Sequence, residues 1–428
     1  MRTYRLEELL GKISITLMMM YVFFWDNKII VYSKAALYLS VILAVGVVFI
    51  RGAVFAGKNT ENVKWLFIIL ILSIAGMFLN INSSAGTEWC LSIFLILLYS
   101  VFLNNTPELR SFTVKMIILF SAYHTFGIIM QSINPAFVNS INRVMLKSSA
   151  YATNIDLLSI NYYSGFSGYN CAAGLYASVL SGAMLVKFMD SIKKKKSIHV
   201  RILYLIAAAA GFYAVIMTQK RGLMIATAIA YITVLWVLIK EKKGMLLRII
   251  LIAAGMCLIA LWLLNNTESG QQILSRFDES DSFMSGREII YKRLFEGIAE
   301  RPLFGHGTGS GSDFSGGVNA HNIYLQLMYD GGIILLAAYV IFFINSLFKT
   351  VKNIVHTDNE QDRLYSIYFL YIQVVFLIYG FTGNPLYDLY MFYIYITAVA
   401  FSKPRVSPNR EKDIYKKVNV DAEGVNLH

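Results

Sequence analysis

The most prominent pattern in the chain is a series of long apolar stretches separated by mostly short polar connections. A helix that crosses about 30 Å of hydrocarbon needs about 20 mostly apolar residues, with a range of roughly 17 to 25. By this criterion the pattern predicts an all-α fold, a polytopic membrane helix bundle of about twelve transmembrane helices. The predicted spans cover residues 12–25, 32–50, 63–80, 88–103, 112–132, 170–188, 202–218, 222–239, 246–264, 321–345, 364–381 and 386–402.

The spacing of these stretches also predicts the domain organisation. Residues 1–402 are expected to form a single transmembrane domain, and the polar segment 403–428 a tail. Two connections, 133–169 and 265–320, are much longer than the others. Connections longer than about 12 to 15 residues are usually functional or disordered, so these two are the first places to look for chemistry.

Composition and charge support a membrane protein and set its orientation. Hydrophobic residues make up 57% of the chain and charged residues 15%, and the mean hydropathy is +0.56. The net charge of +12 does not indicate nucleic-acid binding, because Lys and Arg form short clusters between apolar runs. Alternate connections hold 27 of the 38 Lys and Arg residues, which makes that side cytoplasmic. Both termini are then expected inside, with 133–169 and 265–320 outside.

The 265–320 segment contains a predicted amphipathic helix. Ser285-Gly286-Arg287-Glu288 has the form of a capping box, in which the Ser and Glu side chains bond backbone N–H groups reciprocally. Ile290, Leu294 and Ile298 then repeat at helical spacing, and Pro302 ends the run. This helix is expected to lie on the membrane surface or on the helix bundle.

Two cationic sites on the outer side are candidates for binding an anion. Arg287 is predicted in the first turn of the amphipathic helix, where the dipole disfavours a cation unless an anion is bound. The alternative is a solvated Arg287 offset by Glu288. Lys220 and Arg221 form a very short outer turn, against the positive-inside bias. They could bind a substrate phosphate or simply pair with lipid headgroups.

His321 is the candidate general base. It opens a predicted span beside Asn322, which is a candidate to orient it and to contact substrate. An imidazole can accept a proton near neutral pH. The alternative is a structural histidine at a helix end. Gly305 and Gly307 belong to a glycine-rich run that either contacts a ligand or forms a turn.

Ionisable residues inside predicted spans and aromatic residues in an outer segment are further candidates, each with a structural alternative. His124 and Asp330 are ionisable residues inside predicted spans, although a hydrogen-bonded His between helices is a common structural element. The aromatic residues of the other outer segment, Tyr162, Tyr163 and Phe166, could stack on sugars. No His pair has metal-ligand spacing, so neither a metal nor another cofactor is predicted.

Taken in order, four short motifs resemble the O-antigen ligase/Wzy polymerase superfamily over residues 205–345. They are Arg221-Gly222, Ser285-Gly286-Arg287, Pro302-Leu303-Phe304-Gly305-His306-Gly307, and His321-Asn322 followed by Gly331-Gly332. The resemblance implies a GT-C-like membrane glycosyltransferase with its active site on the outer face of the bacterial cytoplasmic membrane. Its donor would be an undecaprenyl-pyrophosphate-linked oligosaccharide, and transfer would be metal-independent.

The resemblance also implies roles for single residues. Arg221 and Arg287 would hold the pyrophosphate, and His321 would activate the acceptor hydroxyl. Flippase and chain-length regulator proteins would be partners, together with membrane lipid. The resemblance does not identify the acceptor. A repeat-unit polymerase is favoured because such enzymes are numerous, and a ligase acting on lipid A core or protein is the alternative. A transporter is disfavoured because the distinctive charges lie outside.

Overall fold

A computed structural model describes residues 2–28, 33–52, 61–80, 83–239, 265–266, 271, 275, 287–314 and 320–402. The regular secondary structure of these residues is helical, apart from one isolated bridge between Asn27 and Leu146. The main helices of the bundle are α1 (Arg2–Phe24), α2 (Ser33–Ile50), α3 (Glu61–Met77), α4 (Ser84–Asn105), α5 (Arg110–Ile133), α8 (Asn170–Lys193), α9 (Ile198–Met217), α10 (Arg221–Ile239), α15 (Ile323–His356), α16 (Glu360–Tyr379) and α17 (Leu389–Phe401). The connections contain η2 (Pro107–Leu109), α6 (Pro135–Met145), α7 (Ser148–Ser159), α13 (Glu288–Glu300) and α14 (Ser310–Phe314).

The helices follow the predicted spans closely. Eleven of the twelve predicted stretches coincide with a helix, and the twelfth, 246–264, lies outside the described residues, as does the tail 403–428. Six helices in the described part of the chain are long and apolar enough to cross a membrane. They are Ser84–Asn105, Pro107–Ile133, Asn170–Lys193, Ile198–Met217, Arg221–Leu238 and Ile323–His356. The fold is therefore a helical membrane bundle in which length and hydropathy support six spans within the described residues, and the count of about twelve stays a prediction.

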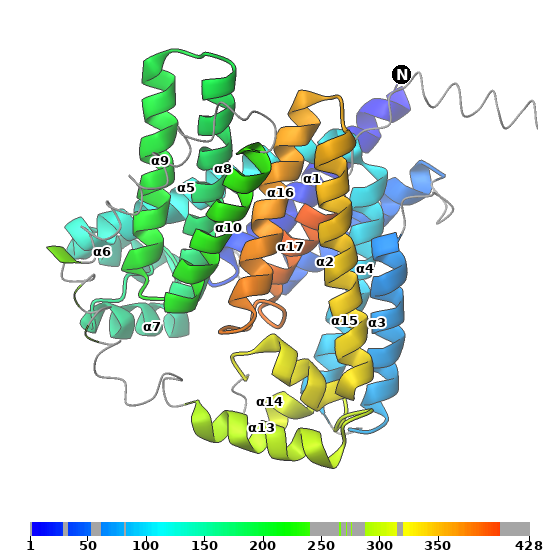
Figure 1. The fold of residues 1–428 in the computed structure, drawn as a ribbon. Helices are drawn as coiled ribbons and strands as arrows, with labels where there is room; N and C mark the ends of the chain where they lie inside the picture. Colours follow the sequence, from blue (N-terminus) through cyan, green and yellow to red (C-terminus); the bar gives the residue numbers. More distant parts are fainter. Residues whose placement is uncertain are drawn as a thin grey trace, which may run out of the picture.

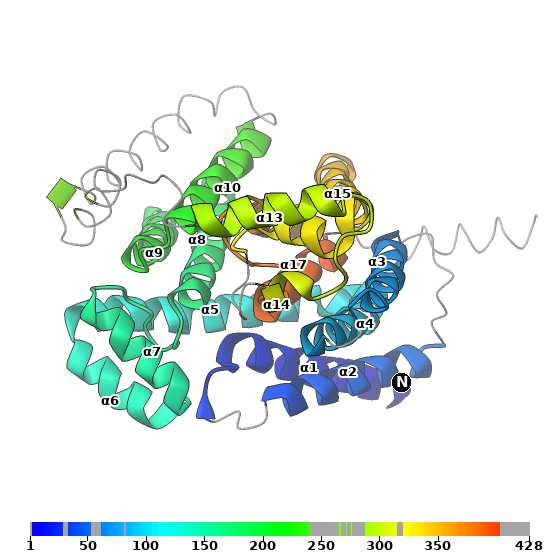
Figure 2. The same cartoon turned by 90° about the horizontal axis from the view of Figure 1, so that it is seen from below.

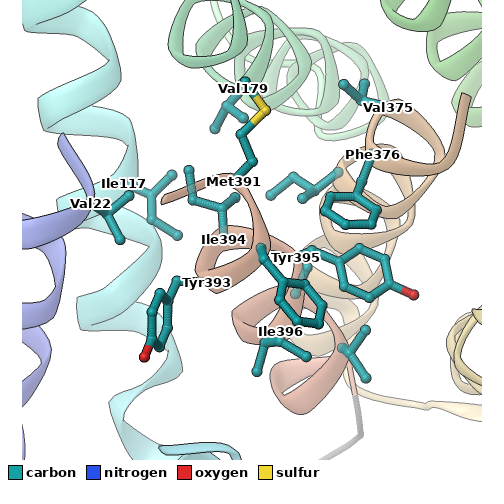
Figure 3. Close-up of a cluster of buried hydrophobic side chains, with 14 of the residues drawn as sticks. Val22, Ile117, Val179, Val375, Phe376, Met391, Tyr393, Ile394, Tyr395 and Ile396 are labelled. Carbon is teal, nitrogen blue, oxygen red and sulfur yellow. The ribbon is translucent and has the colours of Figure 1, made fainter. Parts of the chain in front are cut away.

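Helix α17 lies in the middle of the bundle. Figure 3 shows Met391, Tyr393 and Tyr395 of α17 among side chains from α1, α5, α8 and α16. Every residue from Tyr390 to Phe401 is buried. Because lipid is as apolar as the core, such packing stabilises a membrane bundle through close van der Waals contact rather than through removal of surface from water. The central position of α17 also fixes the connection before it, which carries part of the candidate site.

The two ends of the bundle differ in structure. The N-terminus, the α8–α9 turn and the α15–α16 turn lie together at the upper end in Figure 1. Helices α7 and α13 lie across the lower end, where the α16–α17 connection also emerges (Figures 1 and 2). The connections predicted to be cytoplasmic therefore lie at one end of the bundle, and those predicted to be outside lie at the other.

The 133–169 connection is a folded cap rather than an extended loop. It consists of α6, α7 and a turn that returns to the bundle. At its centre the buried Asn154 side chain accepts a hydrogen bond from Gln131 Nε2 (3.0 Å) and donates to Ser164 Oγ (2.8 Å) and the Ser167 carbonyl (2.7 Å). Because buried polar groups need partners, this network fixes the conformation of the cap.

The Arg110–Asp362 ion pair at the upper end gives a stability prediction. Arg110 Nη1 lies 2.9 Å from Asp362 Oδ1, and the side chains are 1% and 5% exposed. Arg110→Ala should destabilise the protein by about 3 to 5 kcal/mol, because it leaves a buried carboxylate without this partner. Thermal unfolding of the detergent-solubilised protein measures the loss. Lys34→Ala, which removes the exposed pair with Glu88, should leave the melting temperature unchanged; equal effects of the two changes would contradict the prediction.

Candidate functional site

The α16–α17 connection, residues 380–388, brings distant parts of the chain together at the lower end of the bundle. Its first residue accepts a hydrogen bond from the start of α15, since Ile323 N lies 2.9 Å from the Gly380 carbonyl. Thr382 accepts a hydrogen bond from Arg287 through its carbonyl, at 3.0 Å from Nη1. The Thr382 side chain also lies against Gly222, where an added Cβ would clash with it. Three of the four sequence motifs therefore meet this connection.

His321 lies at this meeting point, just before α15. It is half-buried and has a left-handed backbone (φ +54°), a conformation that is uncommon for a residue with a side chain. Burial, helped by the positive charges of Arg287 and Lys220, lowers the pKa of His321 to about 4. The imidazole is therefore neutral at pH 7 and able to accept a proton.

Asn384 is the polar partner of His321. The Asn384 amide nitrogen lies 3.3 Å from His321 Nδ1, and Asn384 is only 8% exposed. If the amide nitrogen donates, the neutral imidazole carries its proton on Nε2. If the amide is turned so that its oxygen accepts, the proton is on Nδ1 and the Nε2 lone pair is open. The second arrangement is the one that a general base acting through Nε2 requires.

Asn322 does not orient His321, which corrects the sequence-based expectation. Its Oδ1 accepts hydrogen bonds from the backbone N–H groups of Tyr324 (3.0 Å) and Leu325 (3.1 Å), so Asn322 caps α15. Its predicted contact with substrate stays a prediction. The neighbouring Asn384 was missed because it follows His321 by 63 residues and lies in a short connection without a recognisable motif.

Arg287 is the N-cap of α13, not part of its first turn, because the helix begins at Glu288. The proposed capping-box Ser285 lies outside the described residues. The amphipathic helix itself is confirmed: Leu294 and Ile298 are buried, and they pack in one cluster with Tyr329 of α15. This packing lays α13 across the lower end of the bundle and brings Arg287 to the α16–α17 connection (Figure 2).

The α9–α10 turn supplies further positive charge. Gln219 in this turn is buried and has a left-handed backbone (φ +59°), and Asn170 Nδ2 donates to the Thr218 carbonyl (3.0 Å). Lys220 follows, and it acts electrostatically on His321. Arg221 is the first residue of α10, directly before the glycine that packs on Thr382. The turn therefore places both cations on the same side as Arg287.

Asp388 is a titratable residue of this connection that sequence reasoning missed. It ends the α16–α17 connection as the residue before α17. Burial raises the pKa of Asp388 to about 7, against the opposing effects of the Lys220 charge and a hydrogen bond from Tyr390. The carboxyl group therefore exchanges a proton near neutral pH, next to the cation that also acts on His321.

The glycine-rich segment packs against the bundle. Backbone N–H groups that could cradle a phosphate are used within the protein: His306 N donates to the Tyr329 carbonyl (2.9 Å) and Gly307 N to the Asp330 carbonyl (2.8 Å). Gly305 and Gly307 have positive φ, and a Cβ on Gly305 would meet the backbone of α15. The structure thus gives these glycines a packing role, and their contact with substrate stays a prediction.

The remaining candidates have structural partners. His124 is fully buried in α5, and its Nε2 lies 2.8 Å from the Phe23 carbonyl of α1, as a helix-bridging histidine would. Asp330 accepts hydrogen bonds from Gly311 N (2.6 Å) and the Tyr387 hydroxyl (3.3 Å), which ties α14 and the α16–α17 connection to α15. Phe166 is buried against another aromatic ring, so it offers no surface for a sugar.

Comparison with known proteins covers the central part of the chain. The family model described as O-antigen ligase matches residues 174–340, which include Arg221, Arg287 and His321. The α16–α17 connection, with Asn384 and Asp388, follows the matched segment. No curated protein matches the chain. Among the described residues, no three His, Cys, Asp or Glu side chains are grouped as a metal ion would need.

Proposed function

We propose that the protein is a bacterial surface-polysaccharide polymerase of the O-antigen ligase/Wzy superfamily, because the O-antigen ligase family model matches residues 174–340. It transfers a glycan from a polyprenyl pyrophosphate, undecaprenyl pyrophosphate in bacteria, to the hydroxyl group of an acceptor sugar. The observation that carries the proposal is the meeting of His321, Arg287 and the α9–α10 turn at residues 380–388. A base and several cations at one point are what this transfer needs.

The cations stabilise the leaving group. As the bond between the anomeric carbon and the pyrophosphate oxygen breaks, negative charge grows on the pyrophosphate. Arg287, Lys220 and Arg221 present fixed positive charge to it, and fixed charges that bind the transition state more strongly than the ground state accelerate the step. Arg287 is suited to this role because its guanidinium forms paired hydrogen bonds with phosphate oxygens. Transfer in this scheme needs no metal ion.

His321 activates the acceptor. The acceptor oxygen forms a bond to the anomeric carbon while its proton passes to the neutral imidazole, and the pyrophosphate leaves with the bonding electron pair. Attack from the face opposite the leaving group inverts the anomeric configuration. The low pKa of His321 keeps the imidazole unprotonated at neutral pH, although it also limits its strength as a base. Binding of the anionic donor would offset the nearby positive charges and strengthen the base.

The positive-inside pattern supports an active site on the outer face of the cytoplasmic membrane, with both termini inside. In this orientation the donor reaches the enzyme after a flippase has moved it across the membrane. Flippase and chain-length regulator proteins are therefore the proposed partners.

Reconstitution of the purified protein with a synthetic polyprenyl-pyrophosphate-linked repeat unit tests the proposal. A polymerase should convert the single repeat unit into lipid-linked chains of increasing length and release polyprenyl pyrophosphate. Absence of both products from a folded, reconstituted protein would contradict the assignment. Deletion of the gene in its host should leave surface glycan with single repeat units only.

Ligase activity is the second candidate, favoured by the description of the matching family model. A ligase would transfer a finished lipid-linked polymer to lipid A core or protein, by the same chemistry with a different acceptor. Deletion of its gene would then leave lipid-linked polymer and bare acceptor. The two activities are thus separated by the product that accumulates.

The cations near His321 lead to a prediction about pH. Because His321 must be neutral to act as a base, and its pKa is about 4, kcat/KM should fall only as the pH drops toward 4. Lys220→Gln removes one repelling charge, so the pKa of His321 should rise and the acidic limb should move to higher pH. The pH dependence of kcat/KM measures this shift. Lys292→Gln, on the exposed face of α13, is the matched control, and an unmoved limb in Lys220→Gln would refute the coupling.

A further inference from the structure

A cavity of about 200 Å³ lies near the upper end of the bundle, away from His321. Helices α5, α8, α9 and α16 surround it, close to the α8–α9 turn at the top of Figure 1. Helix α8 has 24 residues and so spans about 35 Å between its ends. Its first turn lies near the candidate site and its last turn lines this cavity, so the two sites are separated by the thickness of the bundle.

The end of the cavity nearest the α8–α9 turn is positively charged. Lys187, Lys194 and Lys196 contribute to its lining, with Asp190 as the carboxylate among them. Asp190 is engaged by Lys194, whose Nζ lies 3.0 Å from the carboxylate. Lys194 also lies 4.0 Å from the Glu360 carboxylate of α16, so the positive charge that is not neutralised in this way belongs to Lys187 and Lys196.

The two remaining lysines converge on one aromatic ring. The ammonium groups of Lys187 and Lys196 lie 5.9 Å and 6.0 Å from the centre of the Tyr204 ring, so they lie within about 12 Å of each other. No ion pair with a carboxylate is found for either lysine within the described ranges. Two ammonium groups at this separation attract an anion, which can lie between them.

The cavity becomes apolar with depth. Ala183 and Val186 precede Lys187 on α8, and Val114 and Ile118 lie one to two turns inside α5. On α16 the lining changes in the same direction: Gln361 lies near the start of the helix, and Leu364 lies about one turn deeper in the bundle. The lining therefore changes from cationic to aliphatic along the direction that leads from a membrane surface toward its interior.

From this gradient we propose that the cavity binds an anionic phospholipid of the leaflet at that end. The phosphate lies between Lys187 and Lys196, and the start of an acyl chain lies against the aliphatic residues. A soluble phosphate would use the lysines but leave the aliphatic part unexplained. Basic pockets between transmembrane helices are suited to anionic headgroups. The inference is independent of the proposed function, because it uses none of the residues near His321.

Native mass spectrometry of the full chain in detergent tests the proposal. Dioleoyl phosphatidylglycerol, which is anionic, should bind roughly tenfold more tightly than dioleoyl phosphatidylcholine, which has the same acyl chains and no net charge. The double variant Lys187→Gln/Lys196→Gln should lose roughly 10- to 30-fold in affinity for phosphatidylglycerol, as expected for two ammonium groups near a membrane surface. Lys187→Arg/Lys196→Arg keeps both charges and should retain binding.

Lys352→Gln is the matched control, because Lys352 is exposed on α15 at the same end of the bundle and does not line the cavity. It should bind phosphatidylglycerol as the unmodified protein does. Equal affinity of the double Gln variant and the unmodified protein would overturn the site. Complete displacement of the lipid by inorganic phosphate at equal concentration would overturn the lipid assignment and indicate a soluble phosphate ligand.

Discussion

His321→Ala should reduce glycan transfer by at least about 100-fold, because a general base contributes roughly 10² to 10⁴ to a rate. The variant should fold normally, since the His321 side chain is half-buried and its described hydrogen bond is to Asn384 alone. The backbone at residue 321 stays left-handed in the variant, a conformation that Ala tolerates no better than His, so its melting temperature is measured alongside. Turnover of a synthetic lipid-linked repeat unit by the purified variant measures the loss.

His356→Ala is the control for this experiment. His356 is exposed at the opposite end of α15, where its Nδ1 lies 2.8 Å from the Lys352 carbonyl. Its replacement should leave transfer unchanged. Full activity of His321→Ala would exclude this residue as the base and leave Asp388, whose carboxyl group titrates near neutral pH, as the candidate.

Arg287→Ala should lower kcat by about 10² to 10³, the cost of removing one preorganised group that stabilises developing negative charge. Arg287→Lys should restore activity only in part, because an ammonium group keeps the charge but not the paired donors of a guanidinium. Steady-state kinetics with the lipid-linked donor separate the effect on kcat from the effect on KM. A rise in KM with unchanged kcat would assign Arg287 to uniform donor binding instead.

Arg293→Ala is the matched control on the same helix. Arg293 is exposed on α13 and lies away from the buried face formed by Leu294 and Ile298. Its replacement should leave kcat unchanged. Because Arg287 also donates to the Thr382 carbonyl, thermal unfolding of both variants should be compared, and a large loss of stability in Arg287→Ala alone would indicate a structural role.

The helices and several site residues could be predicted from the sequence because their signals are local. Long apolar stretches predict the positions of α4, α8 and α15, since any helix that crosses lipid must satisfy its backbone within itself. The spacing of Leu294 and Ile298 predicts the buried face of α13. Arg287 could be identified because a cation at a helix N-terminus is disfavoured unless an anion is bound, and His321 because an imidazole beside an apolar segment can act as a base near neutral pH.

Other parts of the site could not be predicted because they depend on which distant segments meet. Asn322 is next to His321 in the chain, but helix geometry turns its side chain to the backbone of α15. Asn384 replaces it from another connection. Gly305 and Gly307 resemble a ligand-binding loop in sequence. In the structure, however, α15 accepts a hydrogen bond from the Gly307 N–H group and occupies the space that a side chain at residue 305 would need.

The sequence by itself determined that this is a helical membrane protein, where most of its helices lie, and which cations and which histidine face the same side, because hydrophobicity and charge are properties of single segments. Only the tertiary structure decided that α17 is central, that the α16–α17 connection gathers His321, Arg287 and the α9–α10 turn, and that Asn384 and Asp388 belong with them. It also decided that lysines at the far end of α8 share a cavity with aliphatic side chains. Such groupings arise from packing between helices distant in the chain, which local patterns do not encode.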